Sequence, residues 1–261
     1  MAHKTKVSGT EYTITKGKTR VSGTDYSISG GKTRVGGTHY TLPLGSTGGG
    51  STIGDLSVGS ILNFNVGTNS RQFLIVHKGL PSDIYDASCD GVWLMGVNGA
   101  AACRWTSNTS EGAKNSYRLS ITHGYLPTTW AGTLETRVKD SMITAKIPYY
   151  CGRDQKLYTG SEGLGAKVFA PSLLELGVAV DGIAPIDGAT LDYFKDGSDS
   201  TRILKTSSGG ALTYWTRTPV LDTTDEIWYI DTDGAATITE TTSSDSRQMR
   251  PTFILPYDFE I

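Results

Sequence analysis

The chain has 261 residues, of which 37% are hydrophobic and 19% charged, with a formal net charge of −2. This length allows one sizeable core, and the composition is globular, which argues against a disordered chain or a membrane protein. No apolar run approaches the roughly 18 residues of a membrane span, and the first residues lack the apolar core of a secretory signal. We therefore expect synthesis in a cytoplasm and no membrane insertion.

The first forty residues contain a repeat of fourteen residues. Lys4 to Ile14 recurs as Lys18 to Ile28 and again as Lys32 to Leu42. Each unit predicts a short strand around its valine, a turn at Gly9, Gly23 or Gly37, and a second strand in which Tyr and Ile or Leu alternate with polar residues. One such unit is too small to bury its apolar face. Residues 1–43 are therefore predicted to be an all-β arm for assembly or attachment.

The arm is basic and the rest of the chain is acidic. Residues 1–43 hold seven Lys and Arg against two acidic residues, about +5, which leaves seventeen against twenty-four, about −7, for residues 44–261. Nucleic-acid binding is one interpretation of a basic segment. However, the cations recur at fixed positions beside the strands, where they protect exposed edges, and no nucleic-acid-binding motif accompanies them. We therefore expect no nucleic-acid partner.

The main domain is predicted to follow a flexible Gly/Ser linker over residues 44–52 and to cover residues 53–261. Its start predicts a hairpin, with a strand through Phe64, a turn at Gly67 to Asn69, and a buried strand over 73–76. Residues 92–95 predict another buried strand.

Two helices are expected in the middle of this domain. Between Pro127 and Ile147 the apolar residues have a helical period, with Thr128 or Thr129 as N-cap and Pro148 as the stop. Residues 171–177 predict a short helix with a glycine C-cap. Strands, then helices, then a β-rich end indicate the α+β class.

The C-terminal part is a polar segment between two stiff ends, Tyr214 to Pro219 and Arg250 to Leu255. Alternation along residues 226–231 places Trp228 and Ile230 on a core face. The Asp233-Gly234 pair predicts a two-residue hairpin turn with positive φ, after which Ala236 and Ile238 point inward. We expect the outward side chains between the two stiff ends to form a surface with a fixed conformation.

Metal and redox chemistry find little support in the sequence. Cys89, Cys103 and Cys151 are too scattered for a disulfide framework or a C-x-x-C pair, so we interpret them as small buried hydrophobes. A zinc site assembled from distant Cys and His residues is the alternative, for which the spacing offers no argument. The Asp231-Thr232-Asp233-Gly234 run lacks the later ligands of a calcium loop and is better explained as a turn. No metal and no cofactor are predicted.

Several of these stretches resemble a known family. The motifs Tyr214-Trp215-Thr216-Arg217-Thr218-Pro219, Trp228, Gly234 and Arg250-Pro251-Thr252-Phe253 look like a lectin-like domain of phage and prophage tail genes in gut bacteria. That domain often follows repeats of the type Lys-Thr-x-Val-Gly-Gly-Thr-x-Tyr, which Lys32 to Tyr40 match. The resemblance implies a C-type-lectin-like fold, shared with formylglycine-generating enzymes and with the variable proteins of diversity-generating retroelements.

In those variable proteins, side chains before the C-terminal strand contact the receptor. Carried onto this chain, the resemblance implies structural anchors at Trp215, Arg217, Pro219, Trp228, Gly234, Arg250 and Pro251. Trp215 and Trp228 are expected in the core, and Arg217 and Arg250 are expected to bind buried carbonyls or carboxylates. The expected ligand-binding residues lie between them, led by Tyr229: Thr223, Asp225, Ile227, Tyr229, Asp231, Thr237, Thr239 and Thr241.

The function that the resemblance implies is host recognition by a phage tail or a phage-like particle made in a bacterial cytoplasm. Its expected partners are a cell-surface receptor, other tail or baseplate proteins through residues 1–43, and two further copies in a homotrimer. An enzyme is not expected, because no cysteine follows Cys151 for the oxidase chemistry of the related enzymes, and the exposed acids give no reason for separated pKa values. A purely structural tail component and an enzyme acting on surface glycans remain the alternatives.

Overall fold

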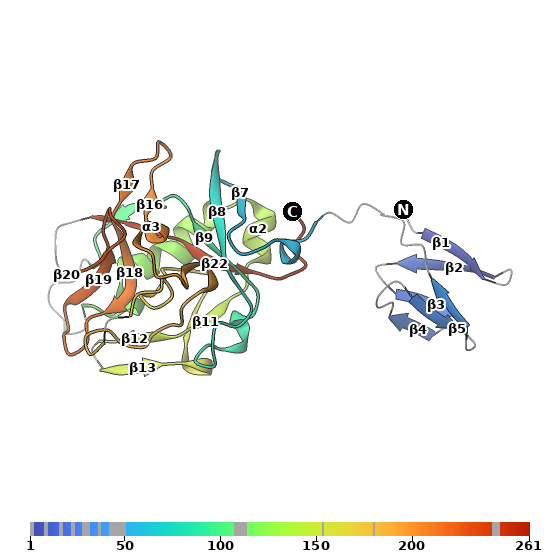
Figure 1. Ribbon diagram of the computed structural model, residues 1–261, viewed down its shortest axis with the longest axis horizontal. Coiled ribbons are helices and arrows are strands. Elements are labelled where there is room, and N and C mark those ends of the chain that lie inside the picture. The colour runs from blue at the N-terminus through green and yellow to red at the C-terminus, as the bar shows by residue number, and fades with distance from the viewer. Residues whose placement is uncertain are drawn as a thin grey trace. The chain divides into compact units, whose positions relative to one another are not determined.

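The computed structural model divides the chain into two compact units, Met1–Gly50 and Ser51–Ile261 (Figure 1). In the second unit the structure describes residues 51–106, 114–152, 154–179, 181–241 and 246–261. In the first unit it describes the backbone of six strands. The predicted turn glycines at 9, 23 and 37 and residues 44–50 of the predicted linker lie outside the described residues.

Each fourteen-residue repeat of the first unit forms one antiparallel hairpin. The hairpins are β1 (His3–Val7) with β2 (Thr10–Thr15), β3 (Lys18–Val21) with β4 (Thr24–Ser27), and β5 (Lys32–Val35) with β6 (Thr38–Thr41). The register is the same in all three, since Val7 pairs with Thr10, Val21 with Thr24 and Val35 with Thr38. A further pairing of β2 with β3 joins the first two hairpins into a four-stranded sheet.

One five-stranded sheet of the second unit is antiparallel throughout and has the order β15-β22-β9-β8-β7. Its strands are β7 (Ile61–Val66), β8 (Asn69–Lys78), β9 (Val92–Gly96), β15 (Val168–Phe169) and β22 (Thr252–Leu255). The predicted hairpin around Gly67 and the predicted strand over 92–95 are confirmed. The core lies against this sheet, where Phe73, Trp93 and Phe253 are buried.

A second five-stranded sheet carries the C-terminal segment, in the order β10-β21-β18-β19-β20. Its strands are β10 (Ala102–Cys103), β18 (Tyr214–Pro219), β19 (Glu226–Ile230), β20 (Ala236–Glu240) and β21 (Arg247–Met249). β18 runs parallel to β21, and the remaining neighbours are antiparallel. The strand predicted around Trp228 and its hairpin partner are therefore confirmed.

The turn between β19 and β20 differs from the prediction. It contains five residues, and of Asp233 and Gly234 only Gly234 has a positive φ, at 87°. The carboxylate of Asp231 organises this turn by accepting hydrogen bonds from the backbone N–H groups of Asp233 and Ala235, both at 2.9 Å. A side-chain acceptor that closes the turn removes the need for a two-residue type I′ geometry.

The smaller elements complete a mixed α+β domain. Three two-stranded sheets pair β11 (Ala145–Ile147) with β14 (Leu164–Ala166), β12 (Tyr149–Cys151) with β13 (Lys156–Tyr158), and β16 (Leu204–Lys205) with β17 (Ala211–Leu212). The helices are α1 (Ile121–Tyr125), α2 (Thr136–Ser141) and α3 (Asp199–Arg202). Single 3-10 turns cover Ile53–Asp55, Ala87–Cys89, Tyr117–Leu119, Ala131–Thr133, Gly160–Glu162 and Asp192–Phe194.

The helix predicted between Pro127 and Ile147 is wrong in its bounds. α1 begins at Ile121, where the hydroxyl of Ser120 accepts a hydrogen bond from His123, and then widens into a π-helical turn over Leu126–Trp130. Leu134 is extended, with ψ of 148°, and separates this region from α2. The side chain of Leu134 is buried, although its backbone is not helical. Because its position in the sequence fits a helical period, the pattern of buried residues resembles that of one long helix.

The second predicted helix, over 171–177, is a series of turns instead. The carboxylate of Glu175 accepts a hydrogen bond from the backbone N–H of Ser172. In return, the hydroxyl of Ser172 accepts one from the backbone N–H of Glu175. Gly177 follows with φ of 73°, and an added Cβ there would lie 2.3 Å from the carbonyl oxygen of Phe194. The glycine stop is confirmed, but the helix before it is not.

The two ends of the second unit meet through backbone hydrogen bonds. Ile53 donates to Phe259 at 2.8 Å, Gly54 to Tyr257 at 2.9 Å, and Ile261 to Ser51 at 3.0 Å. Ser51 and Thr52, which were expected in the linker, therefore pair with the C-terminal residues.

The close approach at Gly234 gives a stability prediction. An added Cβ would lie 2.0 Å from the carbonyl oxygen of Asp199, and the positive φ strains any other residue. We expect Gly234→Ala to lower the free energy of unfolding by about 1–3 kcal/mol. Gly124→Ala in α1 is the matched control, since nothing lies within 4 Å and alanine favours a helix. Equal midpoints of chemical denaturation for the two variants would contradict this.

Candidate functional site

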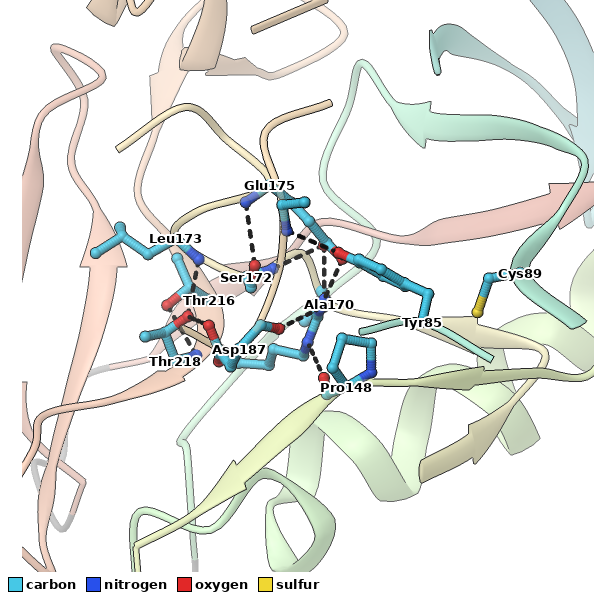
Figure 2. Close-up of polar contacts among 12 residues, drawn as sticks. Tyr85, Cys89, Pro148, Ala170, Ser172, Leu173, Glu175, Asp187, Thr216 and Thr218 are labelled. Atoms are coloured by element: carbon cyan, nitrogen blue, oxygen red, sulfur yellow. Dashed lines mark hydrogen bonds and ion pairs between the residues drawn. The ribbon is translucent and has the colours of Figure 1, made fainter. Parts of the chain in front are cut away.

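The centre of the second unit is a buried guanidinium, that of Arg217 in β18. Its Nη1 and Nη2 each donate to the carboxylate of Glu175 at 2.6 Å. The remaining donors reach the carbonyl oxygens of Pro148, Ala170 and Asp187 at 3.0–3.1 Å. All five N–H groups are therefore satisfied, although Arg217 and Glu175 are both fully buried. Figure 2 shows how these partners converge from segments far apart in the sequence.

The same carboxylate also holds a tyrosine and a turn. The hydroxyl of Tyr85 donates to Glu175 at 2.7 Å (Figure 2). It also accepts a hydrogen bond from the backbone of Ala189 at 3.1 Å. Burial, together with the charge of Glu175, raises the pKa of Tyr85 well above its ordinary value. Burial alone would lower the pKa of Arg217, but the attraction of Glu175 outweighs it and raises that pKa. Arg217 and Glu175 thus form a charged pair held in the protein interior.

Asp187 lies beside this pair and is also fully buried. Its Oδ1 accepts a hydrogen bond from the hydroxyl of Thr218 at 3.0 Å, while its Oδ2 has no partner among the described residues. Burial raises the pKa of this carboxyl from 3.8 to about 7, against the opposing charge of Arg217. Asp187 therefore retains a proton in mildly acidic solution.

A second buried arginine, Arg250, holds the other end of the segment. It donates to the carbonyl oxygens of Gly96 and Arg202 and to the hydroxyl of Tyr214, at 2.9–3.1 Å. The side chain of Arg202 in turn donates to the carbonyl oxygen of Gly234 at 2.9 Å. Through Arg250 and Arg202, one network of hydrogen bonds therefore connects the start of β18, the residues between β21 and β22, and the β19–β20 turn.

The other expected anchors are also internal. Trp215 is fully buried and donates to the carbonyl oxygen of Cys103 at 2.8 Å. Trp228 is 5% exposed, and Pro219, Gly234 and Pro251 are buried. These seven residues are scaffold and present no side chain to a ligand.

Two of the expected ligand-binding residues are placed wrongly by the alternation. Ile227 and Thr241 are both fully buried, so neither is available to a partner. Near them, the side-chain amide of Asn115 donates to the carbonyl oxygens of Thr223 and Glu226 at 3.0 and 3.2 Å, so a distant part of the chain binds the loop before β19. Ile227 and Trp228, which point to opposite faces of β19, are both buried, so alternation does not separate a core face from a surface face here.

Two more of these residues have structural roles. The hydroxyl of Thr223 donates to the carbonyl oxygen of Val220 at 3.0 Å, and Asp231 organises the β19–β20 turn. Asp225 is half-buried, and its carbonyl oxygen accepts a hydrogen bond from Thr241. Substituting Thr223 or Asp231 would therefore disturb a loop as well as a surface, whereas the hydrogen bond at Asp225 belongs to its backbone.

Three expected residues lie together and are half-buried: Tyr229, Thr237 and Thr239. Tyr229 pairs directly with Thr237, and Thr239 is two residues further along β20 on the same face. We call these three residues the Tyr229 face. They are the part of the predicted surface that the fold both brings together and leaves accessible.

Arg247 adjoins this face and was missed by the sequence analysis. Its guanidinium lies 3.9 Å from the ring centre of Tyr229 and 4.6 Å from that of Trp215. Tyr229 also meets Trp215 edge to face, at 6.4 Å. These contacts fix the orientation of the Tyr229 ring. Arg247 is brought here by β21, which pairs with β18 and with β10, and no local pattern reveals these pairings.

Among the residues that the structure describes, no group of three or more His, Cys, Asp or Glu side chains is placed to hold a metal ion. Cys89, Cys103 and Cys151 are free thiols, and burial raises the pKa of Cys89 to about 12. No helix in the described part of the chain is long and apolar enough to cross a membrane.

Comparison with known protein families gives one match. A model described as a domain of unknown function (DUF6273) matches residues 91–257. The chain belongs to this family. The matched region contains Arg217, Arg250 and the Tyr229 face. No curated protein and no solved structure matches the chain.

The protonated Asp187 predicts a specific pH dependence. Below about pH 4 the folded and unfolded carboxyls are both protonated, whereas between pH 4 and 7 only the unfolded one releases its proton. This residue therefore lowers stability progressively as the pH rises from 4 to 7, and the full penalty remains above pH 7. The change from 3.8 to about 7 corresponds to a free energy on the order of 4 kcal/mol.

We expect Asp187→Asn to remove this dependence while it still accepts the hydrogen bond from Thr218. Urea unfolding at a series of pH values measures the difference in stability between the two proteins. The variant should gain stability relative to the natural chain from pH 4 to 7. The contributions of His77 and His123 cancel in this comparison. A difference that stays constant across this range would contradict the assignment.

Proposed function

We propose that this chain is a phage or phage-derived tail-tip protein that recognises a receptor on the host cell surface. The Tyr229 face would make the contact. The observation that carries the proposal is that a half-buried aromatic and two hydroxyl groups lie together on the β19–β20 hairpin. The buried Arg202 binds the turn of this hairpin, and the buried Arg217 fixes the neighbouring strand β18. Rigid presentation of a tyrosine lowers the entropic cost of binding, and tyrosine is frequent among residues that dominate binding energy.

The C-type-lectin-like fold is part of this proposal. It is supported by a domain whose two ends pair with each other and whose C-terminal polar segment belongs to a separate sheet. The proposal includes a relation to the variable proteins of diversity-generating retroelements. A neighbouring reverse transcriptase gene, with a near-copy of the coding region for residues 214–255 that differs mainly at adenines, would support that relation.

Residues 1–43 are proposed to join the protein to other tail proteins and to two further copies of itself. Support comes from the small size of the hairpins, since a two-stranded sheet such as β5–β6 is marginally stable alone. The particle would be a virion or a phage-like particle assembled in a bacterial cytoplasm. Light scattering that gave the mass of a monomer at micromolar concentration would contradict the trimer.

The test of the receptor proposal places bulk and charge on the Tyr229 face. Thr237→Arg with Thr239→Arg changes two half-exposed side chains, so we expect a folded protein whose binding to intact cells falls at least about tenfold. Ser207→Arg with Ser208→Arg, on the exposed turn between β16 and β17, is the matched control. Flow cytometry of the labelled full chain on a panel of gut-bacterial strains measures binding. Equal binding by both double variants would refute the assignment of the face.

One observation favours a structural tail component as the second candidate. A hollow of about 470 Å³ beside the β18–β19 turn is lined by apolar side chains, including Leu174, Ile186 and Leu221. Ile186 is 69% exposed and Ile183 is 43% exposed. Exposed apolar side chains around a hollow are typical of protein contacts. Binding of the purified chain to intact cells would count against this candidate.

A further inference from the structure

A separate hollow lies where three segments of the second unit meet. It is formed by the beginning of β8, by the residues that follow β9, and by the helical region after α1, and it has a volume of about 180 Å³. The side chains that matter for its chemistry are Arg71, Gln72, Asn98, Tyr125 and Trp130. It shares no lining residue with the Tyr229 face.

The polar side of this hollow has a cation and two carboxamides. Arg71 is half-buried, and its side chain has no hydrogen bond or ion pair with any described residue. Its planar fork of donors suits a carboxylate, which accepts two parallel hydrogen bonds from it. Asn98 donates from Nδ2 to the carbonyl oxygen of Lys205 at 3.2 Å, which fixes the amide and leaves its Oδ1 as an acceptor. Gln72 is exposed and offers both a donor and an acceptor.

The apolar side is aromatic and rigid. Trp130 is 5% exposed and packs edge to face on Phe73, with ring centres 6.1 Å apart. Tyr125 is half-buried beside it and supplies a ring together with a hydroxyl group. A ligand in this hollow would therefore meet aromatic carbon on one side and hydrogen-bonding groups on the other.

We propose that this hollow binds a single acidic sugar unit, a ring with several hydroxyl groups and one carboxylate. The carboxylate would pair with Arg71, the hydroxyl groups would exchange hydrogen bonds with Gln72 and Asn98, and the carbon face of the ring would rest on Tyr125. The volume is below the roughly 300–1,000 Å³ of pockets for drug-sized ligands, so one ring fits and an extended chain does not. This inference does not rest on the proposed receptor-binding function.

The experiment compares two sugars that differ in one group. Glucuronate and glucose share a ring, but only glucuronate has a carboxylate, so isothermal titration of each into the full chain isolates the contribution of Arg71. We expect glucuronate to bind in the millimolar range or more tightly, with a dissociation constant at least about tenfold lower than that of glucose. Galacturonate with galactose repeats the comparison for a second ring.

Arg71→Gln should remove the preference for the acid while it preserves the fold. Arg104→Gln is the matched control, because Arg104 is exposed and does not line the hollow. We expect this control to keep the tenfold preference. The proposal is overturned if neither acid binds, if each acid binds no better than its neutral partner, or if Arg104→Gln removes the preference as fully as Arg71→Gln does. Far-UV circular dichroism of each variant verifies that a lost preference is not a lost fold.

Discussion

The second unit depends on the buried ion pair between Arg217 and Glu175. Two charges removed from water cost several kcal/mol each, and only complete hydrogen bonding and close attraction offset that cost. Here the guanidinium has a partner for every N–H group, and the carboxylate also binds Tyr85 and Ser172. Removing one member of such a pair leaves the other charge unpaired, which costs about 3–5 kcal/mol. The pair therefore fixes the relative positions of β18, the 170–175 turns and the residues around Asp187.

This ion pair matters for function because Trp215, two residues before Arg217 in β18, pairs with Tyr229. Arg217 holds one end of the C-terminal segment, while Arg250 and Arg202 hold its other end and the β19–β20 turn. Between these fixed points the Tyr229 face is oriented by Trp215 and Arg247. A surface held in this way tolerates changes at its exposed positions because the fold is specified elsewhere. That separation of scaffold from surface is what the proposed recognition function requires.

Local patterns in the sequence predicted the strands well and the contacts between distant segments poorly. The β7–β8 hairpin and β19 follow from alternation, and the bracing roles of Arg217 and Arg250 follow from the geometry of a guanidinium. The partner of Arg217 could not be predicted, because the sequence predicts Glu175 in a short helix and gives no sign that this segment packs against β18. Ile227 and Thr241 are misplaced because both are buried although alternation puts them on the outward face. The binding of Asn115, more than a hundred residues earlier, to the adjoining loop likewise leaves no trace in the local alternation. The hollow beside Arg71 likewise joins three segments that only the tertiary fold brings together.

Hydrogen exchange of the backbone amides tests most directly whether the C-terminal segment is rigidly held. The amides of β18 and β19 should exchange as slowly as those of the central strands β8 and β9, because all of them would open only when the whole second unit unfolds. Exchange of β18 and β19 at the rate of the exposed 206–210 turn, while β8 and β9 stay protected, would contradict the account. The buried arginines would then not hold the surface that the function requires.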